Sequence, residues 1–157
     1  MEKNGKTYTV EDVYEIEREL RYISRMIRQK GREILANFPI TPPQFEALHL
    51  LKEFGDMTIG ELSAKMFLAF STITDLIDRM EANQLVERVR DKQDRRVVRI
   101  HLKEKGREII KEVLSARRNY LASVLEHFSE KEVKDLARIL GLLHNEMIRE
   151  RNQHKST

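Results

Sequence analysis

Two short segments near the middle of the chain alternate apolar and polar residues, and a polar stretch separates them. The segments are Leu85 to Arg90 and Val97 to Leu102, with Asp91 to Arg96 between them. Alternation with a period of two, in segments rich in β-branched residues, predicts a β-hairpin. The sequence around this hairpin has helical periodicity, so we expect a mainly helical fold with one small β element.

The predicted hairpin is strongly basic. From Val86 to Arg107, nine Lys or Arg residues stand against four acidic residues, a local excess of 9 − 4 = +5. The whole chain has a formal net charge of +3, so positive charge is concentrated in this segment. A basic hairpin tip predicts a polyanionic partner.

Composition excludes several classes of protein. With 157 residues, 40% of them hydrophobic, the chain can bury a core that serves one or two small modules. No apolar run reaches the ~18 residues that span a bilayer and the N-terminus has no apolar signal core, so we expect a cytoplasmic protein that does not enter the membrane. The absence of cysteine excludes disulfides, cysteine metal sites and thiol redox sensing. The five histidines form no i, i+4 pair, so we expect neither a metal site nor a cofactor.

Two short helices joined by a tight turn are predicted just before the hairpin. Thr58 and Glu61 fit a capping box that opens a helix ending at about Met66. A second helix is expected over about Phe70 to Asn83, with one apolar face composed of Phe70, Ile73, Leu76, Ile77 and Met80. Helix, turn, helix and hairpin together form a winged helix-turn-helix, which we place at residues 40–103.

Other helices are predicted on both sides of this module. Thr41 followed by Pro42 is a strong start for a helix that ends near Gly55, and a short strand is expected between it and the helix from Thr58. A long helix is expected at 8–38, over Val10 to Phe38, and two more at 104–152, over Glu104 to His127 and Ser129 to Arg151, with Ser129 and Glu132 as a capping box. Residues 153–157 are expected to form a flexible tail of what we take as a single chain over 1–157.

The long flanking helices carry apolar stripes that the small module cannot cover. Examples are Ile16, Leu20, Ile23 and Ile27 before the module, and Leu136, Leu140 and Leu143 after it. A second copy of the chain would cover these stripes, so we expect a homodimer in which the flanking helices form the interface.

From Pro42 to Gly106 the chain resembles the MarR family of bacterial transcription regulators. The resemblance rests on the segment FSTITDLIDRMEANQLVER at Phe70 to Arg88 and on Asp94-Arg95-Arg96. These arginines are followed by VVRIHL at 97–102 and then by Lys105-Gly106. The order of the predicted elements agrees with the family along nearly the whole chain.

The resemblance implies a homodimeric, sequence-specific DNA-binding regulator rather than an enzyme. The helix at 70–83 would lie in the major groove of a double-stranded operator, and the wing at 91–96 in the adjacent minor groove. We expect a repressor that binds a pseudo-palindromic site. The alternative is a winged helix that serves as a protein–protein adaptor without DNA binding, for which the wing arginines would be dispensable.

The wing has side chains suited to a narrow minor groove, where negative potential is concentrated and a guanidinium enters more readily than an ammonium. The carboxylate of Asp94 can hold an arginine extended; by the family pattern Arg96 is inserted and Arg95 lies nearer the phosphates.

The helix at 70–83 is acidic, since Asp75, Asp78 and Glu81 against Arg79 give 1 − 3 = −2. We therefore expect affinity to come mostly from the wing, Lys65 and Arg88. The residues expected to contact DNA are Lys65, Ser71, Thr72, Thr74, Asp75, Arg79, Arg88, Asp94, Arg95 and Arg96.

Each of these assignments has a plainer alternative. The wing arginines can form structural ion pairs, the helix residues can belong to an ordinary exposed face, and Asp78 can pair with Arg79 or with a neighbouring helix. Family members often have Ser or Thr where Ala69 stands and Thr where Lys103 stands, so both helix starts lack a capping hydroxyl here.

The resemblance also implies a small phenolic or lipophilic effector between the flanking helices and the module. The residues expected there are Tyr22, Met26, Phe38, Phe45, His49 and Phe67. Packing in the core is the alternative for each of them.

Overall fold

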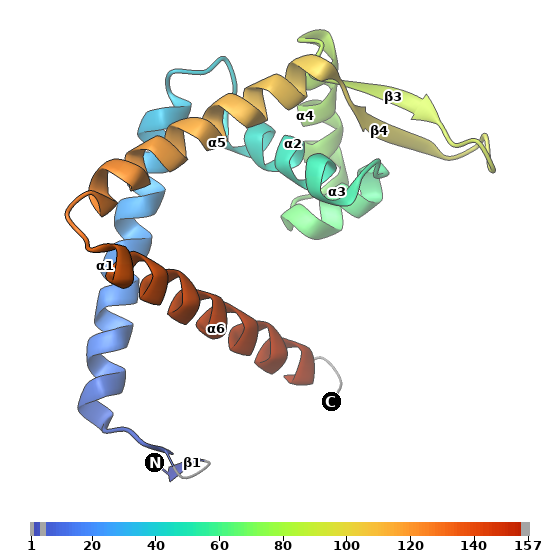
Figure 1. Cartoon of the computed structure of the whole chain (residues 1–157). Coiled ribbons are helices and arrows are strands. Elements are labelled where there is room, and N and C mark those ends of the chain that lie inside the picture. Colours follow the sequence, from blue (N-terminus) through green and yellow to red (C-terminus); the bar gives the residue numbers. More distant parts are fainter. Residues whose placement is uncertain (1, 4–5, 155–157) are drawn as a thin grey trace. The chain divides into compact units, whose positions relative to one another are not determined.

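The structure, a computed structural model, describes residues 2–3 and 6–154 (Figure 1). Compact units are formed by Met1–Arg117 and by Arg118–Thr157, and each is described by itself. The strands are β1 (Glu2–Lys3), β2 (Lys6–Thr7), β3 (Val86–Arg90) and β4 (Val98–Leu102). The helices are α1 (Val10–Leu35), α2 (Pro42–Phe54), α3 (Ile59–Met66), α4 (Phe70–Ala82), α5 (Glu104–Leu125) and α6 (Glu130–His154). The mainly helical fold with a two-stranded wing is as predicted, whereas the small β1–β2 pair was not.

Capping side chains fix where several helices begin. Thr58 and Glu61 form the predicted capping box at the start of α3, and Ser129 and Glu132 form the one before α6. Thr41 caps α2 as predicted, with Pro42 at the first helical position. As predicted, Ala69 provides no side-chain cap for α4. These local signals stand in the sequence itself, which is why they were predictable.

The ends of α1 and α6 differ from the prediction by three residues each, and α5 ends at Leu125 rather than His127. α1 ends at Leu35 rather than Phe38, where the chain turns with a bond from the Phe38 N–H to the Leu35 carbonyl ahead of Pro39. A proline disfavours the helical conformation in the residue before it, so the helix cannot continue. α6 runs through His154, so the first two residues of the predicted tail at 153–157 are helical; the remainder lies outside the described residues.

The core of the module lies between α2, α3, α4, the β3–β4 sheet and the start of α5. One fully buried side chain from each is Leu48, Leu62, Ile77, Ile100 and Ile110. Full burial of such a side chain stabilises the fold by about 1.5–3 kcal/mol, so this core holds α4 and the wing in one rigid body.

The apolar face predicted for α4 is buried at Ile73, Ile77 and Met80, but Phe70 is 61% exposed. Phe70 is the first residue of the helix and lies beyond the edge of the core, so helical periodicity alone did not show that the core ends before it.

The wing is an antiparallel pair in which Val86 faces Leu102 and Arg90 faces Val98. It projects beyond the helices of the module (Figure 1). The strand expected between α2 and α3 is reduced to a single bridge, where the Ile100 N–H donates to the Met57 carbonyl at 2.7 Å. No helix within the described residues is both long enough and apolar enough to cross a membrane.

Candidate nucleic-acid interface

Asp91 organises the turn at the tip of the wing. One of its oxygens accepts the backbone N–H groups of Gln93 (2.8 Å) and Asp94 (3.1 Å), and the other accepts Arg99 Nε at 2.6 Å. These hydrogen bonds lower the pKa of Asp91 to about 2, and the bond from Arg99 has a larger effect than the two backbone donors. The turn is therefore held by a carboxylate that stays ionised at neutral pH.

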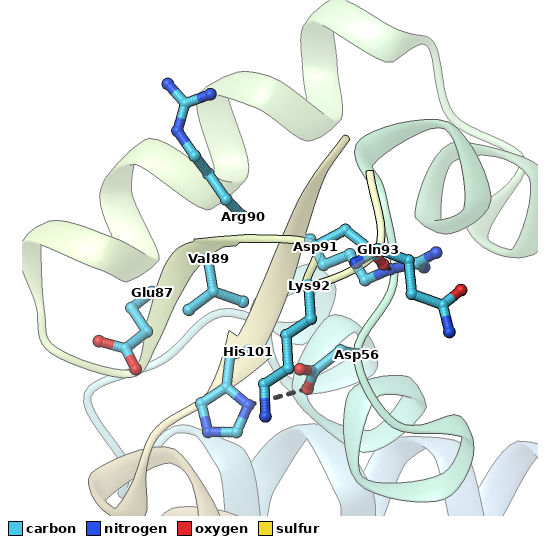
Figure 2. Close-up of a pocket in the computed structure, with 9 residues that line it drawn as sticks. Asp56, Glu87, Val89, Arg90, Asp91, Lys92, Gln93 and His101 are labelled. Carbon is cyan, nitrogen blue, oxygen red and sulfur yellow. Dashed lines mark hydrogen bonds and ion pairs between the residues drawn. The ribbon is translucent and has the colours of Figure 1, made fainter. Parts of the chain in front are cut away.

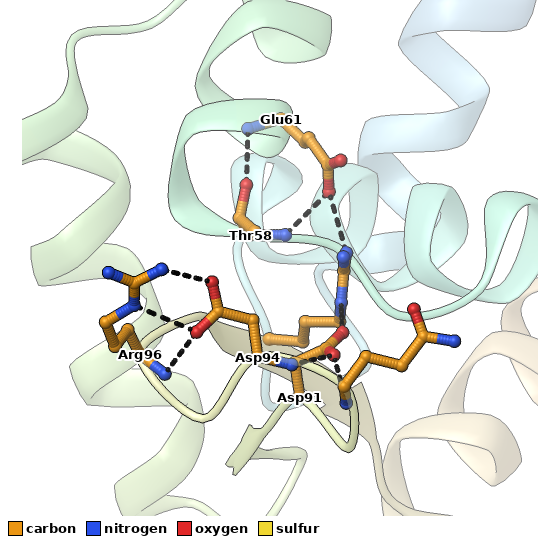
Figure 3. A network of polar contacts seen from close by, with 7 residues as sticks. Thr58, Glu61, Asp91, Asp94 and Arg96 are labelled. Carbon is orange, nitrogen blue, oxygen red and sulfur yellow. Dashed lines mark hydrogen bonds and ion pairs between the residues drawn. The ribbon is translucent and has the colours of Figure 1, made fainter.

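Asp94 holds the guanidinium of Arg96, and the sequence led us to expect this pairing. Arg96 Nε and Nη2 donate to the two Asp94 oxygens at 3.1 and 3.2 Å, and the Arg96 N–H donates to the first oxygen at 3.1 Å (Figure 3). These bonds from Arg96 lower the pKa of Asp94. The Arg96 side chain is nevertheless 91% exposed, so the brace presents a fixed cation to solvent.

The wing is also tied to the start of α3. Arg99 Nη1 lies 3.5 Å from an oxygen of Glu61, and the same oxygen accepts the Thr58 N–H at 2.8 Å (Figure 3). One carboxylate thus caps α3 and contacts the arginine that holds Asp91. This connection fixes the wing tip relative to the helix-turn-helix.

Arg88 joins the wing to α4 rather than facing outward. Its guanidinium donates to Asp78 at 2.6 Å and to Glu81 at 3.0 Å, and its backbone N–H donates to Glu81 at 2.8 Å. Two carboxylates already hold Arg88 in the free chain, and its contribution to phosphate affinity stays a prediction. The pairing also answers the question of Asp78, whose partner is Arg88 and not Arg79. With Arg88 included, the charge of the acidic helix changes from −2 to −1, which lessens its repulsion of phosphates.

The exposed surface of α4 carries four residues expected to contact DNA: Ser71, Thr72, Asp75 and Arg79. Thr74 is half-buried, and its hydroxyl donates to the Phe70 carbonyl at 3.0 Å, so it offers only lone pairs and a methyl group.

The remaining expected cations lie at the two ends of this surface. Lys65 stands at the end of α3, with Nζ 3.9 Å from the centre of the Phe54 ring. The Arg95 side chain is exposed at the wing tip and forms no ion pair with any described residue. The module therefore exposes polar and cationic side chains on α3, α4 and the wing.

Comparisons with known proteins agree with this geometry. The model of the MarR family matches residues 40–98. The chain is 56% identical over 140 residues to the uncharacterized HTH-type transcriptional regulator YsmB of Bacillus subtilis (strain 168), covering 89% of this chain and 96% of that protein. It is equally similar, at 56% identity and a TM-score of 0.82, to the solved structure of a MarR family protein from Bacillus stearothermophilus, covering 90% of this chain and 99% of the other. The chain belongs to the MarR family.

MarR membership makes this chain a DNA-binding winged helix-turn-helix transcription regulator and not an enzyme. A point mutant of S. aureus MepR, solved bound to an oligodeoxyribonucleotide, shares the fold with a TM-score of 0.64 at 21% identity, over 90% of this chain and 99% of that one.

Sequence reasoning missed three residues that shape the wing of this MarR protein. Asp91 and Arg99 hold the turn, and Arg90 Nη1 donates to the Arg95 carbonyl at 2.9 Å. An Asp at the start of a polar turn is a known signal for a side chain that accepts from the backbone two residues later, so Asp91 could have been found. The partners of Arg90 and Arg99 depend on strand register, which the sequence does not display.

A groove of about 630 Å³ lies along one face of the wing (Figure 2). His101 Nδ1 and Asp56 Oδ1 meet there at 2.9 Å. Its charged lining consists of the acids Asp56, Glu87 and Asp91, the bases Arg90, Lys92 and Arg99, and His101. Acids and bases balance, so the groove has no charge preference for a polyanion.

The six residues expected to bind an effector have different environments. Phe45 is buried in the core, with the Arg117 guanidinium 4.8 Å from its ring centre and the His49 ring at 6.0 Å, and Phe38 packs against the same core. Tyr22 and Met26 are exposed on α1, and Phe67 is 87% exposed. A ring as exposed as Phe67 lines no enclosed pocket within one chain, and the core-packing alternative holds for Phe45 and Phe38.

Proposed function

We propose that this chain is a homodimeric repressor that binds a pseudo-palindromic operator, with α4 in the major groove and the wing in the minor groove. The observation that carries the proposal is the brace between Asp94 and Arg96, which holds a 91% exposed guanidinium at the end of a rigid hairpin. An unbraced arginine loses up to ~2 kcal/mol of side-chain entropy when it is fixed in a complex. The brace removes part of this cost before DNA binds.

The wing also suits the minor groove by its charge. Arg95 and Arg96 stand next to each other at the tip, and both side chains are exposed. A narrow minor groove attracts such side chains because its negative potential is enhanced. The protein–protein adaptor, our alternative, gives no reason for fixing an exposed arginine in this way.

The dimer is supported by apolar surface left uncovered in the single chain. Along α1, Val13 is 50%, Ile16 56%, Ile23 48% and Ile27 60% exposed. α6 has no buried residue. A two-fold dimer that covered these stripes would present two modules to half-sites about one helical turn apart, and a repressor of this kind would occlude a promoter in the cytoplasm.

We also propose that a small phenolic or lipophilic effector releases the DNA. Support comes from the exposed side chains of Tyr22 and Met26 on α1, which the core of the single chain does not cover. Absence of cysteine leaves no thiol for oxidative release. Calorimetric titration of a phenolic carboxylate, with Met26→Ala as the comparison, tests this part by itself.

Fluorescence anisotropy with the DNA upstream of the chain's own gene tests the main proposal. Arg96→Ala should weaken binding by about ten-fold or more, since a lost specific contact costs ~1–3 kcal/mol. The slope of log K against log salt should also become shallower by about 1.8, because a dimer loses two cations at ~0.9 each. Lys92→Ala, which removes a charge from the same turn without touching the brace, should have a smaller effect.

Arg96→Lys and Asp94→Asn separate charge from presentation. Both should fall between the wild type and Arg96→Ala, because each keeps the positive charge but loses the two-point hold. All four variants should melt like the wild type, since the brace is exposed. Salt-insensitive or absent binding by the wild type would favour the adaptor, and unchanged affinity of Arg96→Ala would refute the minor-groove placement. A promoter–reporter fusion then distinguishes repression from activation.

A further inference from the structure

The turn between α3 and α4 exposes apolar side chains next to the DNA-binding surface. Phe67 is 87% exposed, Leu68 37% and Phe70 61%. The apolar residues that follow on α4, Ile73 and Ile77, are completely buried. Unlike these two residues, Phe70 therefore contributes little to the stability of the core.

Phe70 has a defined position at the tip of α4. It is the first residue of the helix, and its carbonyl accepts the Thr74 hydroxyl at 3.0 Å. The two residues after it, Ser71 and Thr72, are exposed on the surface expected to contact bases. Phe70 thus lies at the same end of α4 as these two residues, the end that enters the groove first.

The major groove offers one apolar feature to such a side chain, the 5-methyl group of thymine. Residues at the N-terminal end of a recognition helix reach base edges, and phenylalanine is among the side chains that contact this methyl group. Nearby, Thr74 already donates its hydroxyl proton within the helix. Beside the hydroxyls of Ser71 and Thr72, the exposed ring of Phe70 adds an apolar contact surface at this end of α4.

We propose that Phe70 is a specificity-determining residue that reads the 5-methyl group of one thymine in each operator half-site. The proposal deepens the proposed function and rests on α4 lying in the major groove. It differs from the wing contact, which supplies affinity through phosphates and groove potential. Phe67 precedes the helix, with a left-handed backbone (φ 54°), and is not part of this reading.

Selection of an operator from a random duplex pool by the full-length protein provides the DNA. Each thymine of the selected operator is then replaced singly by deoxyuridine, which removes only the methyl group. We expect one replacement per half-site to weaken the wild type about four-fold, the effect of one apolar carbon group. Phe70→Ala should bind thymine and deoxyuridine equally at that position, while retaining the wild-type response to salt.

Phe67→Ala is the matched control, because it removes a more exposed ring three residues earlier, and it should keep the wild-type pattern of deoxyuridine effects. Phe70→Leu, which preserves an apolar tip, should retain part of the discrimination. Identical deoxyuridine profiles for Phe70→Ala and the wild type would overturn the inference alone and assign the exposed ring to a protein or effector contact. Failure to select any sequence would overturn both this inference and the proposed function.

Discussion

Neighbouring aspartates of the wing tip have different tasks at the scale of single residues. Asp91 accepts two backbone N–H groups and Arg99, so its charge shapes the turn. Asp94 accepts Arg96, so its charge sets the direction of a solvent-exposed cation. Removal of the Asp91 charge should disturb the fold of the wing. Removal of the Asp94 charge should disturb only the direction in which the Arg96 side chain points.

The pKa of Asp91 leads to a prediction about stability at low pH. Because folding lowers this pKa from 3.8 to about 2, the carboxylate stabilises the folded state above pH ~4, and that contribution is lost as the pH falls toward 2. Urea unfolding should show Asp91→Asn less stable than the wild type at pH 6, with a constant difference down to about pH 5. The difference should shrink below pH ~4 and vanish near pH 2. A difference that persists unchanged at pH 2 would mean that the Asp91 charge does not act through folding.

At the scale of single elements, the residues that follow α4 determine where this helix ends. At the C-terminus, the Leu85 N–H donates to the Met80 carbonyl and the Gln84 N–H to the Glu81 carbonyl, both at 3.0 Å. Gln84 has a φ of 64°, the left-handed conformation that this helix ending requires. The chain then enters β3 directly, so this turn aims the wing.

Replacement of Gln84 by glycine should stabilise the protein. A side chain in the left-handed region costs about 1–2 kcal/mol, and glycine avoids this cost while losing ~0.5–1 kcal/mol of backbone entropy. We expect the free energy of unfolding in urea to rise by about 0.5–1 kcal/mol. Gln84→Ala is the control, because it loses the same 2.7 Å bond from Lys103 Nζ without relieving the backbone. Equal stability of the two variants would show that the backbone conformation is not strained.

Elements with local signals were predictable from the sequence, and contacts between elements were not. α3 begins and ends where Thr58, Glu61 and the periodicity placed it. The brace from Asp94 to Arg96 spans two residues and was also expected. The ion pairs of Arg88 were not expected, because its partners lie seven and ten residues away on another element. Phe70 was placed in the core because periodicity gives the direction of a side chain but not where the core ends.

The behaviour of the whole molecule depends on what covers the apolar stripe of α1. Five residues of this stripe, spaced three or four apart, are at least one-third exposed in the single chain: Val13, Ile16, Leu20, Ile23 and Ile27. Soluble proteins rarely leave so long a stripe in contact with water, so a partner surface is expected. If that partner is a second copy, the stability of the fold and the affinity for a two-part operator both depend on protein concentration.

Two acidic variants of α1 test the dimer with the same added charge. Ile27 and Gln29 are two residues apart, which places them about 200° apart around the helix. Ile27→Glu puts an unpaired carboxylate into the apolar stripe, and we expect at least a ten- to hundred-fold weaker dimer by sedimentation velocity, because an unpaired buried charge costs several kcal/mol. Gln29→Glu should sediment like the wild type, since the Gln29 side chain is exposed and donates to Glu33 of the same helix at 3.4 Å. Ile27→Glu should also bind the operator more weakly, because a monomer engages one half-site at a time. Gln29→Glu should keep the wild-type operator affinity. A wild type that sediments as a monomer at micromolar concentration, or equal behaviour of the two variants, would show that the stripe is not a dimer interface.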